Sequence, residues 1–232
     1  MEPTTAFLNT PPRARVATLR GFTVVELLVA LGIILIITTI VITGQTNFNR
    51  SLVLTDTTYT VAFTLRQAQS LGLSSRKFGT TQNAGYGVNF VSGANTTYTL
   101  FADTEPAAPG NAQSGACVGH SVTSGLDAKP GNCLYDSTNE KVTTYTIGKG
   151  FTISSFCGAD SGGTQRCSGS YLDSLAISFL RPNTQANIVG VRSGTLIPLT
   201  SATITISSPD GSQTRCIKVT KVGQIAVGPT CQ

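Results

Sequence analysis

Residues 21–42 read GFTVVELLVALGIILIITTIVI, an almost uninterrupted apolar run near the amino terminus. From Phe22 to Ile42 the run has 21 residues. As an α-helix it would be roughly 31 Å long, close to the thickness of a bilayer core. It is longer than the apolar region of a secretory signal peptide, and no A-x-A-like cleavage site follows it. The run therefore predicts a membrane-spanning helix over residues 22–42.

Three arginines precede the predicted span, namely Arg13, Arg15 and Arg20. Positively charged flanks of a membrane helix stay on the cytoplasmic side. This rule keeps residues 1–21 in the cytoplasm and places everything after Ile42 across the membrane. The formal net charge is +5, of which these arginines and Glu2 account for +2 (three minus one). The small excess in the rest of the chain permits contact with nucleic acid or anionic lipid without requiring it.

Glu26 is the one charged residue inside the predicted span. A carboxylate in a membrane helix costs about 3 kcal/mol and is normally paired. No Lys or Arg occurs between Glu26 and Arg50, so no basic side chain one or two turns away supplies a partner. A cut between Gly21 and Phe22 would create an α-amine, and at about 4 Å such a pair is worth about 4 kcal/mol. We hypothesise that Glu26 pairs with a Phe22 amine, either within its own helix, where the geometry is cramped, or on an adjacent subunit, where the pair would set the register of assembly.

The segment RGFTVVELLVALGIILI, residues 20–36, resembles the prepilin leader and amino-terminal helix of type IV pilins and type II secretion pseudopilins. The resemblance implies that a prepilin peptidase cleaves after Gly21, that Phe22 becomes N-methylated, and that Glu26 guides assembly. It also implies a location in the inner membrane and then in a pilus or pseudopilus filament. The implied partners are other pilin or pseudopilin subunits, the prepilin peptidase, the inner-membrane assembly platform and membrane lipid.

Residues 43–75 continue the span with a helical pattern. Apolar side chains recur at helical spacings, at Phe48, Leu52, Tyr59, Phe63 and Leu71. This pattern predicts one long helix to about Leu71 or Leu73, with this apolar face covered by the head. Gly44 and the nearby threonines lower the helix propensity, so we expect a kink or partial melting at residues 43–47.

Residues 76–232 are expected to form a β-rich head. Only 12% of the chain is charged, which favours a secreted β-rich domain over a helical cytosolic enzyme. Short β-like runs separated by turn residues predict eight strands, over residues 86–90, 97–101, 141–147, 151–156, 175–180, 202–207, 215–220 and 224–227. We expect an α+β architecture with an antiparallel sheet packed on the long helix. The resemblance specifies this architecture as the type IV pilin fold.

Six cysteines lie in the second half of the chain. Their even number favours disulfides, and the lack of any CxxC pair argues against a zinc site. The sequence-local pairing joins Cys117 to Cys133, Cys157 to Cys167, and Cys216 to Cys231, although other connectivities are open. Two of these bridges would tie down segments 103–140 and 157–167, both of which we expect to be exposed loops.

The tail SQTRCIKVTKVGQIAVGPTC, residues 212–231, resembles the final strand pair of the GspH/FimT group of pseudopilins and minor pilins, with a turn near residues 221–223. LRQAQSLGLSSR at residues 65–76 and YGVNF at residues 86–90 extend this likeness. The resemblance implies a structural subunit, in a minor role, of a type IV pilus or type II secretion pseudopilus.

A DNA-binding or adhesive minor pilin, acting in DNA uptake or surface attachment, is the alternative function that the resemblance implies. Arg215, Lys218 and Lys221 are the candidate phosphate contacts. The DNA-binding members carry a basic Gly-Arg-x-Arg-like tail, whereas residues 223–226 here read GQIA. A solvated strand face is the simpler explanation of these charges.

Motifs for catalysis or cofactor binding are missing from the sequence. His120 is the single histidine, and no nucleophile-elbow sequence accompanies it. No P-loop or dinucleotide fingerprint occurs, and Gly162 and Gly163 read as turn residues. We therefore expect neither enzymatic activity nor a cofactor or metal.

Overall fold

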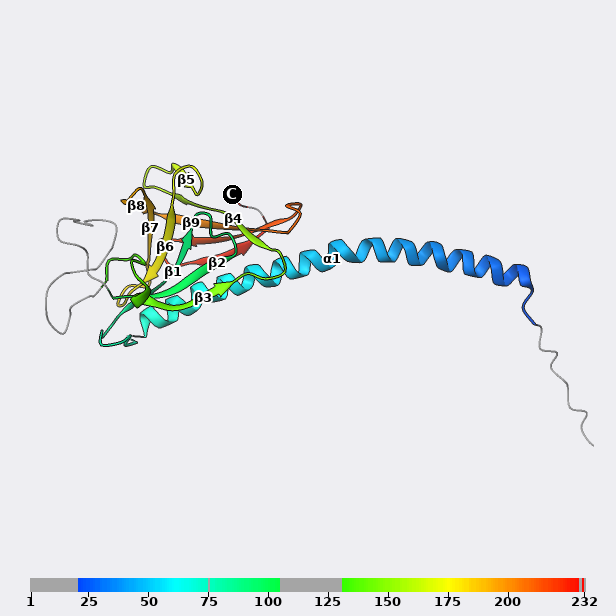
Figure 1. Ribbon diagram of the computed structural model, residues 1–232, viewed down its shortest axis with the longest axis horizontal. Coiled ribbons are helices and arrows are strands. Elements are labelled where there is room, and N and C mark those ends of the chain that lie inside the picture. Colours follow the sequence, from blue (N-terminus) through cyan, green and yellow to red (C-terminus); the bar gives the residue numbers. More distant parts are fainter. Residues whose placement is uncertain (1–20, 75, 105–130, 230, 232) are drawn as a thin grey trace, which may run out of the picture. The chain divides into compact units, whose positions relative to one another are not determined.

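The computed structural model describes residues 21–74, 76–104, 131–229 and 231. The predictions for Cys117 and His120 lie outside these described residues. The first element is the helix α1 (Val24–Leu73), shown in Figure 1. The chain divides into two compact units between Thr46 and Asn47, and each unit is described by itself.

The amino-terminal unit contains the apolar half of α1. The stretch Val24–Ile42 has a mean hydropathy of 2.8 and is long and apolar enough to cross a membrane, and none of it is buried. These properties are those that the predicted span requires. The helix is assigned without a break from Val24 to Leu73, so the partial melting expected at residues 43–47 is not observed.

The second unit contains the rest of α1 and two antiparallel sheets, where we had expected one. The six-stranded sheet has the order β3-β2-β1-β6-β7-β8 and the five-stranded sheet the order β11-β10-β9-β4-β5. The strands are β1 (Gly85–Val91), β2 (Thr97–Asp103), β3 (Lys141–Thr146), β4 (Thr152–Ala159), β5 (Gln165–Cys167), β6 (Ser174–Phe179), β7 (Ala186–Arg192), β8 (Thr195–Leu199), β9 (Ser201–Ser207), β10 (Thr214–Thr220) and β11 (Ile225–Gly228), with a short 3-10 helix η1 (Thr138–Glu140) before β3. The α+β class with antiparallel pairing is confirmed.

All eight predicted strands are present, and three further strands were missed: β5, β7 and β8. β7 and β8 form a hairpin in which Arg192 pairs with Thr195. Its two turn residues, Ser193 and Gly194, both have positive φ, which is the geometry of the tightest hairpins. Gly190 and Pro198 interrupt the two apolar runs, and such residues weaken a strand pattern in the sequence. The Ser-Gly pair between apolar runs was the signal that could have revealed the hairpin.

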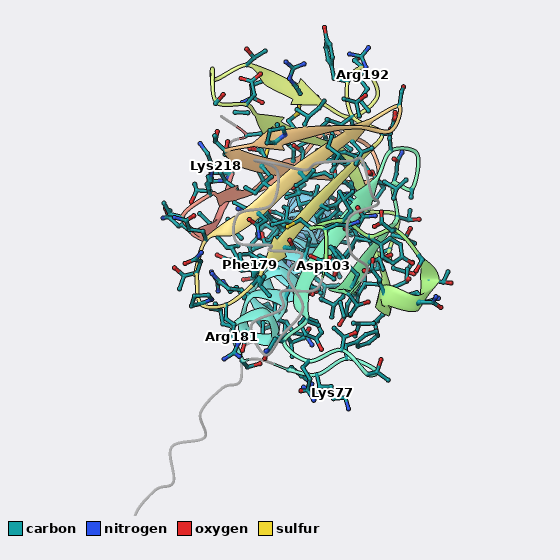
Figure 2. The ribbon with its side chains drawn as sticks, turned by 90° about the vertical axis from the view of Figure 1, so that its left-hand side faces the viewer. Lys77, Asp103, Phe179, Arg181, Arg192 and Lys218 are labelled. Atoms are coloured by element: carbon teal, nitrogen blue, oxygen red, sulfur yellow. A yellow bond between two sulfur atoms is a disulfide. The ribbon has the colours of Figure 1, made fainter. Side chains whose placement is uncertain are left out.

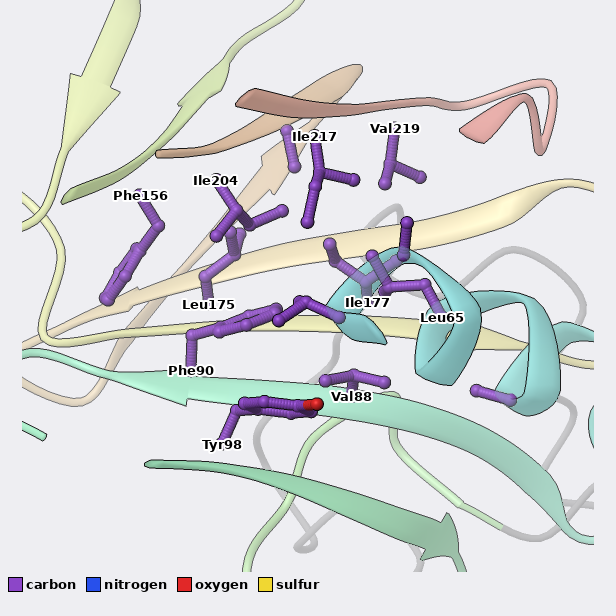
Figure 3. Close-up of a cluster of buried hydrophobic side chains, with 14 of the residues drawn as sticks. Leu65, Val88, Phe90, Tyr98, Phe156, Leu175, Ile177, Ile204, Ile217 and Val219 are labelled. Carbon is purple, nitrogen blue, oxygen red and sulfur yellow. The ribbon is translucent and has the colours of Figure 1, made fainter. Parts of the chain in front are cut away.

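One hydrophobic core joins the head half of α1 to both sheets. Phe90 of β1 is fully buried, with its ring centroid 5.9 Å from that of Tyr98 and 6.4 Å from that of Phe156. Figure 3 shows Leu65 of α1 beside Ile177 of the six-stranded sheet and below Val219 of the five-stranded one. The helix and both sheets therefore depend on the same buried side chains for their packing.

The head covers a different face of α1 from the one predicted. Phe48, Leu52, Tyr59 and Phe63 are exposed. The buried face instead consists of smaller or aliphatic side chains, namely Leu54, Thr58, Val61, Ala62, Leu65 and Ala68. At about 100° per residue the centres of the two faces lie roughly 140° apart. The expectation that the large aromatic face packs on the head is therefore wrong, and only Leu71 of that set contacts the core.

Two of the predicted disulfides are present, Cys157–Cys167 and Cys216–Cys231. Cys157 and Cys167 face each other across β4 and β5, so the two ends of segment 157–167 are paired strands and not a loop. Residues 161–164 between them are exposed, as we expected. Segment 103–140 also differs from the expectation, because its described end has the buried residues Asn132 and Cys133. The sequence-local pairing is thus confirmed at two of its three positions.

Candidate functional site

The junction between Gly21 and Phe22 lies outside the helix, which begins at Val24. The Phe22 side chain is 81% exposed, and apart from Gly21 and its two chain neighbours no atom lies within 4 Å of the position that a Cβ at Gly21 would take. A protease needs an accessible, non-helical substrate segment, and such sites are the preferred places of cleavage. The predicted processing site therefore has the accessibility that cleavage requires.

Glu26 lies in the first turn of α1, where Thr23 caps the helix. The backbone N–H of Glu26 donates to Thr23 Oγ1 at 3.2 Å. Thr-x-x-Glu is the spacing of a capping box, which satisfies N–H groups that a helix end leaves unpaired. A negative charge at this end also interacts favourably with the helix dipole, by about 0.3–1 kcal/mol. The sequence analysis missed this motif, which gives Glu26 a local role besides the predicted one.

The counter-charge proposed for Glu26 is a product of cleavage. Within residues 21–46 that the structure describes, Glu26 has no salt bridge. An α-amine on Phe22 would lie about one helical turn from this carboxylate, and a neighbouring chain could supply a second one. The pairing of Glu26 with a Phe22 amine stays a prediction, and the capping contact is the competing explanation.

The exposed aromatic face of α1 is a second candidate surface. We call Phe48, Leu52, Tyr59 and Phe63 the exposed stripe, because their exposed fractions are 64%, 52%, 53% and 69%. Their spacings of four, seven and four residues place them within about 60° of one another around the helix. Spacings of four and seven residues place apolar side chains on one face of a helix, which such helices use to pack against another element. The exposed stripe is thus a surface suited to a helical partner.

The three basic residues predicted as phosphate contacts do not share one face. Arg215 and Lys218 both belong to β10, three positions apart, so they point to opposite sides of the strand. Lys221 follows the strand, where its backbone carbonyl accepts from the Ala186 N–H. Figure 2 shows other cations of the head, such as Arg181 and Arg192, at places far from Lys218 in that view. The arrangement gives little support to a nucleic-acid interface at these residues.

A pair of buried carboxylates holds residues 131–140 against the end of β2. Asp103 accepts from the backbone N–H groups of Asn132 and Cys133 at 2.7 and 2.8 Å. Glu140 accepts from those of Thr104 and Asp136 at 2.8 and 3.0 Å. Asp103 and Glu140 are both fully buried. Because each carboxylate binds two backbone donors, their arrangement is explained by anchoring the chain and does not require a ligand.

Burial raises the pKa of Asp103 well above its usual range. The hydrogen bonds from the two backbone N–H groups lower this pKa, and the nearby carboxylates of Glu140 and Asp136 raise it further. A group with a raised folded pKa contributes stability that is fully present below about pH 4 and is lost as pH rises through the folded pKa. Asp103→Asn cannot ionise at this position. We therefore predict that the free energy of unfolding of the wild type exceeds that of Asp103→Asn most at acid pH, and that this excess shrinks towards neutral pH. Urea unfolding at several pH values measures this difference. A difference that is constant with pH would contradict the raised pKa.

Metal-binding and catalytic clusters are not seen in the described ranges. Among residues 21–74, 76–104 and 131–229, no group of three His, Cys, Asp or Glu side chains could hold a metal ion. An open cavity of about 170 Å³ lies between α1 and the segment after β3, lined in part by Val53, Asp56, Tyr98 and Ile147. Among the described residues of this lining, the Thr60 hydroxyl donates to the Asp56 backbone carbonyl, and no hydrogen bond joins a threonine hydroxyl to the side chain of Asp56 or Lys149.

No protein-family model, curated protein or solved structure matches this chain.

Proposed function

We propose that this chain is a structural subunit, in a minor role, of a type IV pilus or a type II secretion pseudopilus. The observation that carries the proposal is the combination at the start of α1: an exposed, non-helical Gly21–Phe22 junction followed by a capped helix with Glu26 in its first turn. The stretch Val24–Ile42 is apolar enough to cross a membrane. Cleavage at this junction would leave a charged amine at the end of a membrane helix.

The exposed stripe supports the same function from the second unit. A soluble monomer rarely leaves four large apolar side chains in one row on a helix, and such a row marks a site of association. In a filament of parallel helices, the stripe formed by Phe48, Leu52, Tyr59 and Phe63 would pack on the helix of a neighbouring subunit.

Processing can be tested by measuring the intact mass of the protein isolated from its membranes. We expect a chain that begins at Phe22, carries one added methyl group and retains its disulfides. A Gly21→Leu variant should keep its leader, because a bulky side chain would occupy the position before the cut, whereas Gly32→Leu inside the span should be processed normally. If the working form of the protein retained residues 1–21, the chain would be a simple membrane-tethered head and the proposal would be wrong.

A further inference from the structure

The strand β3 (Lys141–Thr146) forms one edge of the six-stranded sheet (Figure 1). Five of its six residues are exposed and Tyr145 is half-buried. β3 pairs with β2 on one side, and no described strand lies on its other side. A strand with a free edge presents backbone N–H and C=O groups that a further strand can bind.

The three other terminal strands carry features that prevent such pairing. β8 has Pro198 as the fourth of its five residues, and proline removes a hydrogen-bond donor. β5 is only three residues long and is joined to β4 by the Cys157–Cys167 bond. β11 has four residues and is followed by Pro229. Short length and proline are two of the means of protecting an edge, and among the described edges β3 alone has neither. Its own protecting features, the bulge at Val142 and the charge of Lys141, lie at its start, so the stretch from Thr143 to Thr146 is a regular open edge.

The hydrogen bonding of β3 shows which groups face its free side. Just after the strand, the backbone N–H of Ile147 donates to the Thr96 carbonyl at 2.7 Å, so Ile147 points its backbone groups towards β2. Backbone direction alternates along a strand, and therefore Thr144 and Thr146 point their N–H and C=O groups away from β2. Val142 is skipped by the pairing with β2 and forms a bulge. The open edge thus offers Thr144 and Thr146 as its main binding positions.

We propose that β3 binds an extended segment of a partner protein as an added antiparallel strand, with a carboxylate of the partner opposite Lys141. Backbone hydrogen bonds to Thr144 and Thr146 would supply the affinity, as in other cases of strand addition. Lys141 is the single charged residue of β3, and opposite charges on facing residues stabilise a strand pair. The partner's segment would therefore carry an acidic residue near its carboxyl end, and β-branched residues such as Thr and Val would favour its extended form.

The direction of β3 disfavours a second copy of this chain as the occupant. Tyr145 of β3 contacts a late residue of α1, because its Oη donates to Gln67 Oε1 at 3.5 Å. Ile147 and Lys149, which follow in the chain, lie near an earlier residue of α1, because they line the same cavity as Val53. β3 thus runs opposite to the head half of α1. Antiparallel pairing of two β3 strands would make the head halves of the two helices antiparallel, whereas the proposed filament has parallel helices.

Peptide binding to the full chain in detergent tests this inference. The probe is a fluorescent peptide, Thr-Val-Thr-Val-Thr-Val-Asp with blocked ends, and the control peptide ends in Lys. We expect the Asp peptide to bind about two- to fivefold more tightly than the Lys peptide, as a facing ion pair predicts. Lys141→Glu should reverse this preference. Thr144→Pro should weaken binding of the Asp peptide by about tenfold or more, because it removes an outward donor, whereas Thr144→Val should retain binding.

Other outcomes would overturn the inference. These are an Asp peptide that does not bind, a preference unchanged by Lys141→Glu, or equal binding by the two Thr144 variants. A disulfide-linked dimer of Thr144→Cys, with none of Thr143→Cys, would show that a second copy occupies the edge. Only the exclusion of a second copy rests on the proposed function. Peptide binding does not require leader cleavage or filament assembly, so the inference and the proposed function can each fail alone.

Discussion

Replacing Glu26 with Gln should lower the incorporation of this chain into filaments by at least about tenfold. The amide has nearly the shape of the carboxylate and can still serve in a capping box with Thr23, so the start of the helix is retained. It has no charge, however, and an ion pair worth about 4 kcal/mol at about 4 Å would be lost. Glu26→Ala should be equally defective, because both variants remove the partner of the Phe22 amine.

Thr23→Ala is the matched control for this prediction. It removes the hydroxyl that accepts from the Glu26 N–H while it keeps the carboxylate. Loss of an N-cap costs about 1 kcal/mol, which should leave incorporation close to that of the wild type. The measurement is the amount of each variant in sheared filaments relative to the membrane fraction. Normal incorporation of Glu26→Gln together with failure of Thr23→Ala would show that Glu26 acts by capping alone.

Phe90→Ala should destabilise the head by about 3–5 kcal/mol, the usual cost of removing a buried aromatic ring from a core. Phe90 has no exposed surface and its ring packs against those of Tyr98 and Phe156. The cavity would lie where the two sheets share side chains with α1. Because a domain has only about 5–15 kcal/mol of stability in total, urea unfolding should show an early transition.

Phe63→Ala removes the same side chain from the exposed stripe and is the matched control. Phe63 is 69% exposed, so its removal should change the free energy of unfolding by less than about 0.5 kcal/mol. The same variant should lower filament incorporation, since the stripe is proposed to contact a neighbouring helix. A stability loss as large as that of Phe90→Ala would mean that the stripe is packed within the chain, and unchanged incorporation would mean that it is not an assembly surface.

Most strands could be predicted because their patterns are local. The run ATITIS within β9 alternates between buried and half-buried residues, as its period of two requires. The hairpin of β7 and β8 was missed because Gly190 and Pro198 interrupt the pattern. In the fold, Gly190 lies beside Leu172 and Leu199, where a Cβ would clash. The glycine that weakens the strand pattern is therefore required by packing that the sequence does not display.

The sequence by itself determined the apolar span, the Gly21–Phe22 junction, the isolated Glu26 and eight of the eleven strands, because each depends on composition or on spacing within a few residues. Only the tertiary structure decided that the strands form two sheets and which face of α1 they cover. Periodicity identifies an apolar face but not how closely another element approaches it. Here a Cβ at Gly72 would clash with the Phe179 carbonyl oxygen. The backbones approach so closely that the small side chains of Ala62 and Ala68 fit beneath the sheets, while the larger rings of Tyr59 and Phe63 remain outside.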